Sequence, residues 1–406
     1  MSTRRSPSIL IAIASCMALQ MAGFALLLPL FARRFESLGA GVQALGVSAM
    51  AYALICTFAA PSIGMLADRL GRRPIILVSL AGQVLAYTGY LCATSAWLLI
   101  LLRGMAGVFA AGLPPAMTSI VGDLAAENRR AQWIGIVNGS VAIGFIAGPV
   151  LGGLLYDRFG YVVPFAASIA MSAGALVLAV LWIQETHTPA SHPSHPHSTW
   201  TRGLQALPAQ SAFFLLLLLT FGVMFAWAFI EPQFMFYAYD DLAWTSSQLG
   251  LVMSAYGVAF MCGGFALGQL SDRLGRKPVL VLGLALFSAQ FVGLAIFRDV
   301  IWIVVSFILA GLGNALYDPA LSAMILDVAP PEHTAGMMGL KSTAGSFGNL
   351  LGPALVVLIT PFAGPQVVFL IATALVAVLT LVSGLVLRLP GRSRVAHQIS
   401  RAAVER

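Results

Sequence analysis

Four charged residues lie inside long apolar runs, where an ionised side chain is costly and therefore informative: Arg103, Glu231, Asp318 and Lys341. Burying such a charge in a membrane costs roughly 3 kcal/mol even on insertion scales, so each must face a partner or a wet cavity. An isolated carboxyl can carry a proton, whereas a carboxyl–ammonium pair can bind a charged ligand or tie two helices together. These residue types indicate the movement of protons or solutes rather than bond chemistry.

The composition of the whole chain indicates a membrane protein. Of 406 residues, 59% are hydrophobic and 9% are charged, whereas a soluble domain has about 25% charged residues. Lipid forces each spanning segment to satisfy its own backbone hydrogen bonds, so the spans are expected to be helices. We therefore predict an all-α membrane protein with twelve transmembrane helices, over residues 8–31, 43–67, 75–94, 96–122, 131–156, 162–184, 209–239, 246–271, 278–297, 300–327, 336–360 and 365–388.

The basic residues are distributed unevenly between the two sides of this predicted bundle. With the N-terminus inside, sixteen Lys and Arg residues fall in inside loops and tails, and four fall outside. The positive-inside rule then places both termini in the cytoplasm, and we expect a multi-pass protein of a bacterial inner membrane. The net charge of +7 does not indicate nucleic-acid binding, because the basic residues lie between apolar runs.

The chain repeats its landmarks at an offset of 204 residues. A charged, glycine-containing loop at 64–74 returns at 268–278, and Asp123 corresponds to Asp327. Internal repeats of this kind are typical of secondary transporters, whose substrate path runs between the two repeats. A channel or a receptor would not require this symmetry.

We divide the chain into an N-terminal six-helix half (1–185), a cytoplasmic linker (186–208) and a C-terminal six-helix half with a cytoplasmic tail (209–406). The linker is rich in proline and histidine and poor in apolar residues, which favours a flexible segment. Its histidines imply no fixed ligand geometry, and we predict no metal site.

Both copies of the charged loop follow one pattern: glycine, two residues, a small residue, aspartate, arginine, one residue, glycine and two basic residues. On this pattern the chain resembles the major facilitator superfamily over nearly its whole length. The resemblance implies two pseudo-symmetric six-helix halves and a conformational latch at the cytoplasmic side. The latch residues would be Gly64, Asp68, Arg69, Gly71, Arg72, Arg73, Asp123, Asp272, Arg273, Gly275 and Arg276.

Physical chemistry suggests how such a latch would work. Gly64 and Gly71 would allow a close helix approach and a tight turn. Asp68 is expected to cap the start of a neighbouring helix, where an anion meets the positive end of the helix dipole, and the family resemblance implies that this helix is the eleventh span. Arg72 is expected to pair with Asp123. Together these contacts would hold the cytoplasmic side closed.

The fifth span resembles the antiporter motif of drug:proton exchangers in the same superfamily, at Gly144, Gly148, Pro149, Gly152 and Gly153. Its glycines are expected to pack tightly across the interface between the halves, and its proline to kink the helix. The family resemblance of this motif favours export over uptake. An arginine in a setting like that of Arg103 also occurs in the proton-exchanging members.

Glu231 has no cation near it in sequence and is the first candidate for the proton-carrying acid, although it could instead be an interfacial acid facing external water. Asp318 and Lys341 run on antiparallel spans at similar depth, so they could form a functional or a purely structural pair. The aromatic residues and methionines of the seventh span could line a cavity or face lipid. The proton-coupling and substrate candidates are Glu231, Arg103, Asp318, Lys341, Gln20 and Asn314.

The sequence therefore predicts a proton-coupled exporter of small apolar or cationic compounds, a multidrug antiporter that works by alternating access. Its partners would be the substrate, protons and the lipid bilayer, it would act as a monomer, and the proton gradient would take the place of a cofactor. The alternative is a transporter of the same fold for one metabolite, sugar or lipid. An enzyme is not indicated, because no nucleophile–base grouping is visible.

Overall fold

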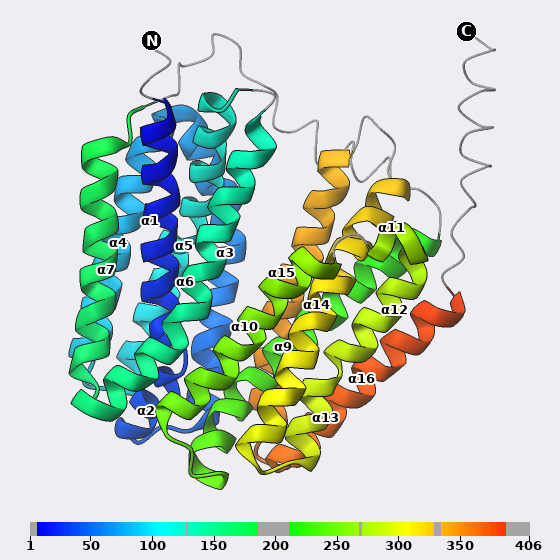
Figure 1. Cartoon of the computed structure of the whole chain (residues 1–406). Helices are drawn as coiled ribbons and strands as arrows, with labels where there is room; N and C mark the ends of the chain where they lie inside the picture. The colour runs from blue at the N-terminus through cyan, green and yellow to red at the C-terminus, as the bar shows by residue number, and fades with distance from the viewer. Residues whose placement is uncertain (1–5, 127–128, 186–210, 268–269, 329–333, 387–406) are drawn as a thin grey trace, which may run out of the picture.

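The computed structural model describes residues 6–126, 129–185, 211–267, 270–328 and 334–386 (Figure 1). All regular structure in these residues is helical, and twelve segments are long and apolar enough to span a membrane. The predicted fold class is confirmed. The predicted linker at 186–208 lies outside the described residues.

The first six spans agree closely with the apolar runs, except that residues 8–31 form two helices. Pro29 has no backbone N–H to donate, so the hydrogen-bond ladder of α1 ends before it and α2 starts after it. The helices are α1 (Ser6–Leu27), α2 (Leu30–Ser37), α3 (Val42–Leu70), α4 (Arg72–Cys92), α5 (Ala96–Leu124), α6 (Arg130–Phe159) and α7 (Val162–Trp182).

The second six spans differ from the expected boundaries at two places. The predicted seventh span ended at residue 239, but Asp240 and Asp241 continue α9 as a π-helical turn, η2. The predicted ninth span, 278–297, forms two helices that are separated at Ser288. The helices are α9 (Ser211–Phe236), η2 (Tyr237–Asp241), α10 (Ser246–Leu267), α11 (Leu270–Leu274), α12 (Arg276–Phe287), α13 (Ala289–Ile296), α14 (Val300–Val328), α15 (Thr334–Ile359) and α16 (Pro365–Val386).

The helices form two bundles that lie side by side, α1–α7 in one and α9–α16 in the other (Figure 1). Within the bundles α1 packs on α6 and α7, α3 on α5, and α9 on α15; α6 meets α10 and α3 meets α15 between them. The bundles converge where α6 ends and α10 begins, and diverge where α1 begins (Figure 1). We call these the closed end and the open end.

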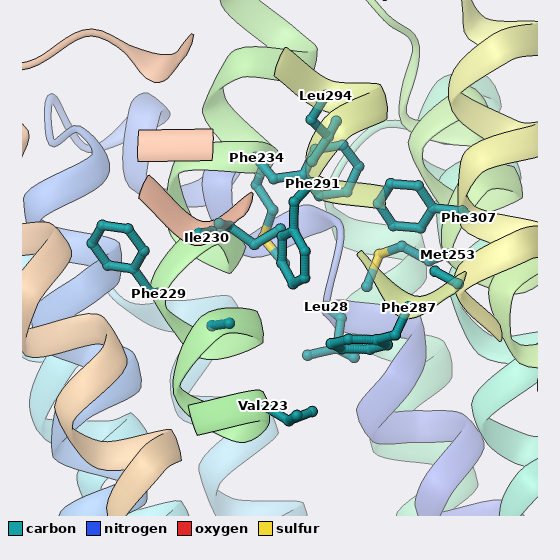
Figure 2. Packing of buried hydrophobic residues seen from close by; sticks show 14 of the residues in the cluster. Leu28, Val223, Phe229, Ile230, Phe234, Met253, Phe287, Phe291, Leu294 and Phe307 are labelled. Carbon is teal, nitrogen blue, oxygen red and sulfur yellow. The ribbon is translucent and has the colours of Figure 1, made fainter. Parts of the chain in front are cut away.

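Aromatic rings from four elements gather in the core of the second bundle (Figure 2). Phe234 of α9 stacks on Phe307 of α14 with ring centroids 5.2 Å apart, and Phe287 meets Phe291 edge to face at 5.4 Å. Phe229, Phe234 and Phe307 are fully or almost fully buried. Much of the aromatic run of the seventh span is thus packed inside the protein rather than against lipid, and it holds α9 firmly beside the bundle interface.

Candidate substrate and proton sites

A cavity of about 450 Å³ lies between the bundles, a volume in the range of drug-sized ligand sites. Helices α1 and α6 supply one side of it, and α9, α10, α12 and α14 supply the other. The lining residues are Met21, Asn138, Val141, Ala142, Phe145, Ile146, Val223, Met224, Trp227, Met253, Tyr256, Gly257, Phe260, Phe287, Phe307, Asn314 and Tyr317. None of these side chains carries a charge. We call this the large cavity.

Aromatic rings and one amide order the second-bundle wall of the large cavity. The Trp227 ring stacks on Tyr256, with centroids 6.1 Å apart and planes 14° from parallel, and Phe307 meets both rings edge-on. The side-chain amide of Asn314 donates a hydrogen bond of 2.7 Å to the Tyr256 hydroxyl, which fixes the position of that ring. Asn314, a sequence candidate, therefore does line a cavity.

Arg103 and Glu231 line a second, much smaller cavity, together with Leu28, Phe31, Leu45, Ala49, Pro232 and Met235. Its volume of about 10 Å³ is close to that of one water probe. The Arg103 guanidinium lies 3.9 Å from the centre of the Phe31 ring. Among the residues that the structure describes, no ion pair joins Arg103 to Glu231. Glu231 has no cation near it in the sequence, but in the fold Arg103 of the other bundle lines the same cavity.

Gln20 lies away from both cavities. Its side-chain amide donates to the Tyr87 hydroxyl at 3.4 Å and its carbonyl oxygen accepts from the Ser172 hydroxyl at 2.9 Å. Gln20 is also buried within the first bundle. These contacts give it a structural role in joining α1, α4 and α7.

Asp318 and Lys341 form a direct pair between α14 and α15. The Lys341 ammonium donates to an Asp318 carboxylate oxygen and to the Ser322 hydroxyl, both at 2.6 Å. The Asp318 side chain is 43% exposed, whereas the Lys341 side chain is 14% exposed. The two charges therefore neutralise each other at the wall of the second bundle.

The repeated loops make matching ion pairs in the two halves. Arg72 pairs with Asp123 and donates to the Ser119 carbonyl at 2.9 Å; at the same offset of 204 residues Arg276 pairs with Asp327. Each pair stays within one bundle, between α4 and α5 or between α12 and α14. The pairing expected for Arg72 is present, but these two pairs brace each half separately and do not join the halves.

Other latch residues have simpler surroundings. Gly71 and Gly275 adopt φ values of +98° and +89°, which L side chains rarely adopt, so the turns need glycine. Gly64 has no neighbouring atom within 4 Å of an added Cβ, so the close approach expected there is absent in this state. Arg69 and Arg273 are exposed. The side chains of Asp68 and Asp272 lie outside the described residues, and with them the predicted cap on the eleventh span.

Glu185, which follows the end of α7, binds the charged loop at 64–74, a contact that the sequence did not predict. Its carboxylate accepts hydrogen bonds from the backbone N–H groups of Arg72 and Arg73, at 3.1 and 3.0 Å. It therefore caps the start of α4, where the unpaired N–H groups of a helix favour an anion. No sequence spacing connects a residue 113 positions away with this loop.

At the closed end, Asp157 joins the two bundles. Its two carboxylate oxygens accept from the backbone N–H groups of Ser246 and Ser247, at 3.0 and 2.8 Å, and so cap the first turn of α10 from the end of α6. The Tyr239 hydroxyl donates to the Pro29 carbonyl at 2.7 Å, and Arg33 lies 4.0 Å from the centre of the Tyr239 ring. We call Asp157, Ser246, Ser247, Tyr239 and Arg33 the closed-end lock.

The antiporter motif packs differently from the expectation. Cβ atoms added at Gly144, Gly148 and Gly152 would overlap α1, within the same bundle; only Gly153 of the four faces the other bundle, against the Ser246 backbone oxygen. From the other bundle, a Cβ atom added at Gly250 of α10 would overlap the carbonyl of Pro149 in α6. The expectation that the motif glycines pack across the interface is therefore wrong for three of them.

Substituting Gly153 by alanine is expected to loosen the closed end, because the new methyl group would collide with the α10 backbone rather than with a flexible side chain. Overpacking of this kind costs typically about 1–3 kcal/mol. Thermal unfolding in detergent measures the effect. Gly139→Ala is the matched control, since it lies on the same helix with no atom within 4 Å of the added Cβ. Equal melting temperatures for the two variants would contradict the tight contact.

Two six-helix bundles around a shared cavity define a membrane transporter rather than an enzyme. The family model of the Major Facilitator Superfamily matches residues 12–239 and 212–403, and the chain belongs to this family. It is 31% identical over 316 residues to the class G tetracycline resistance protein of Vibrio anguillarum, covering 74% of this chain and 77% of that protein.

Two further similarities agree with this assignment. The multidrug resistance protein MdtG of Serratia proteamaculans is 27% identical over 368 residues, covering 87% of both chains. The crystal structure of the nucleoside transporter NupG superposes with a TM-score of 0.79 at 15% identity, over 92% of this chain and 98% of that one. The structural likeness supports the fold, and the sequence similarities support a transporter related to drug-efflux proteins.

Proposed function

We propose that the protein is a proton-coupled exporter of small, largely apolar compounds and that the large cavity is its substrate site. The observation that carries this proposal is an uncharged, drug-sized cavity enclosed between two bundles that meet at one end only. The similarity to tetracycline and multidrug resistance proteins supports export, with antibiotic resistance as the outcome. The protein would act as a monomer, because one chain supplies every wall of the cavity.

The positive-inside rule supplies the orientation of this state. The basic loops that begin α4 and α12 lie at the open end, so we assign the open end and both termini to the cytoplasm. In this orientation the structure represents the inward-open state, with the closed-end lock sealing the outer face. Alternating access would then require the lock to open while the open end closes.

Proton coupling fits the small cavity. Glu231 is an acid on α9 of the second bundle, and Arg103 is a cation on α5 of the first, so the charge state of Glu231 affects the attraction between the bundles. A protonated Glu231 would weaken that attraction and favour separation of the two bundles at the small cavity. An ionised Glu231 would hold the bundles together there. The proton would therefore move through the bundle interface without touching the large cavity.

Proton release on substrate addition tests both parts of the proposal. In proteoliposomes, wild-type protein should release protons when drugs are added and should accumulate several unrelated compounds, whereas Glu231→Gln should bind them without proton movement. Asp299→Asn is the matched control, because the Asp299 carboxylate accepts from the backbone N–H of Ile301 within one bundle and lines neither cavity. Normal proton release by Glu231→Gln would rule out Glu231 as the carrier and leave Asp318 as the next acid to test.

One observation favours a narrower function as the second candidate. Asp318 and Lys341 form a partly exposed pair of opposite charges, which could recognise a zwitterionic metabolite by exchanging partners. Under this alternative one metabolite alone would elicit proton release in the same assay, and Lys341→Ala would abolish its transport. A response to several unrelated drugs would exclude it.

A further inference from the structure

The large cavity combines an aromatic wall with an absence of charge, and this combination restricts what it can bind. Its seventeen lining residues include no Asp, Glu, Lys, Arg or His. An organic cation that enters it would lose hydration without gaining a counter-charge, and contact with the aromatic ring faces, at about 0.5–2 kcal/mol, would offset only part of that cost. An uncharged compound avoids this cost.

The charges next to the cavity are already satisfied. Asp318 follows the lining residue Tyr317 on α14, but its carboxylate is held by the Lys341 ammonium at 2.6 Å. Glu231 and Arg103 line the separate small cavity. Because Lys341 already balances the charge of Asp318, a cationic ligand that approached the second carboxylate oxygen would also meet the charge of Lys341.

The aromatic wall adds a preference of shape. Trp227 and Tyr256 are nearly parallel, and both retain exposed surface in the cavity. Phe307 meets both rings edge-on, and the hydrogen bond from Asn314 fixes Tyr256. Rigid rings offer a large contact area at a small loss of conformational entropy, and they favour flat aromatic partners. We call Trp227, Tyr256 and Phe307 the aromatic wall.

Two amides provide the polar contacts that such a compound needs. Asn138 of α6 lies on the first-bundle side, is exposed, and makes no side-chain hydrogen bond within the described residues. Asn314 lies on the second-bundle side and uses one donor for Tyr256. An amide side chain can donate to a ligand carbonyl and accept from a ligand hydroxyl without requiring a ligand charge.

We propose that the large cavity selects uncharged, planar aromatic compounds bearing carbonyl or hydroxyl groups over organic cations of the same shape, with Trp227 as the main stacking contact for the bound ring system. This inference rests on the proposed function for its biological setting, and it narrows the apolar or cationic substrates expected from the sequence to the uncharged class. Binding itself can be measured without transport.

A pair of tricyclic compounds separates charge from shape. The neutral 10-methylacridone and the permanently cationic 10-methylacridinium share one planar ring system, and the neutral compound carries a carbonyl oxygen. We expect purified wild-type protein in detergent to bind the neutral tricycle at least about tenfold more tightly in equilibrium dialysis, as an unmatched buried charge predicts. Equal binding, tighter binding of the cation, or no binding of the neutral compound would overturn the proposal.

Substitutions at the aromatic wall locate the site. Trp227→Ala should weaken binding of the neutral tricycle about tenfold, since aromatic stacking contributes about 1–3 kcal/mol to comparable complexes, and Trp227→Phe should retain most of it. Trp182→Ala is the matched control, because Trp182 is exposed on α7 and does not line the cavity. An unchanged affinity in folded Trp227→Ala, checked by its melting temperature, would also overturn the proposal.

Vesicle transport distinguishes this inference from the proposed function. If vesicles export drugs while purified protein does not prefer the neutral tricycle, the inference fails and the exporter function stands. If the protein prefers the neutral tricycle while vesicles export nothing, the proposed function fails and the binding preference stands.

Discussion

Replacing Asp157 by asparagine is expected to shift the conformational equilibrium about fivefold, from the state in which the closed end is shut toward a state in which this end is open. The carboxylate accepts two backbone hydrogen bonds across the bundle interface, at 3.0 and 2.8 Å, and sits at the positive end of α10. Asparagine keeps one acceptor oxygen but loses the second hydrogen bond and the negative charge, which together cost about 1 kcal/mol. Because the contact exists only while the closed end is shut, this loss falls on one conformational state alone.

Spin labels on both bundles at the closed end can measure the shift. Ser37 and Arg298 are exposed positions there, one in each half. Distances between labels should lengthen in Asp157→Asn relative to the unsubstituted background. The exposed native cysteines, Cys92 and Cys262, would first be changed to serine.

The matched control is Asp299→Asn. Asp299 also lies at the closed end and caps a helix, α14, by accepting from the backbone N–H of Ile301 at 2.8 Å, but this contact stays within one bundle. Its loss should lower stability in both states equally and leave the label distances unchanged. The lock would be disproved if Asp157→Asn and Asp299→Asn gave the same distance distribution.

Replacing Arg103 by alanine is expected to abolish export and to destabilise the folded protein. Arg103 is buried, its guanidinium lies over the Phe31 ring at 3.9 Å, and it shares a small cavity with Glu231. Removing one member of a buried charge combination costs about 3 kcal/mol or more, because the other charge is left uncompensated. The melting temperature in detergent and drug accumulation in vesicles would show the two effects.

A second substitution separates electrostatics from packing. In Arg103→Ala combined with Glu231→Gln, the uncompensated acid is removed, so we expect much of the lost stability to return while export stays absent. Glu231→Gln alone provides the reference for the pair. If the combined variant were as unstable as Arg103→Ala, the contact with Phe31, and not the charge of Glu231, would account for the stability.

Most of the fold could be predicted because a membrane imposes one simple requirement. Each span needs about twenty apolar residues, so the apolar runs gave all twelve spans. The differences are local changes in the backbone: Pro29 divides the first span, a π-helical turn extends α9, and the ninth span is divided at Ser288. The pairing of Arg72 with Asp123 was also predictable, since it follows from a family pattern.

Contacts between the halves could not be predicted in this way. Glu231 and Arg103 are 128 positions apart on different bundles, and Asp157 reaches backbone atoms of Ser246, 89 positions away. Neither contact produces a local pattern, and backbone partners leave no residue-type signal at all. The closed-end lock therefore became visible only with the fold, as did the cap that Glu185 places on α4.

The large cavity and the small cavity share no lining residue. Under the proposed function the drug and the proton would occupy separate places and would not compete for one position, so each would influence the other only through the equilibrium between conformations. Raising the external proton concentration would then change the maximal velocity of export more than the apparent substrate affinity, which is the kinetic signature of non-competitive exchange. The ratio of protons to drug would also be the same for large and small compounds.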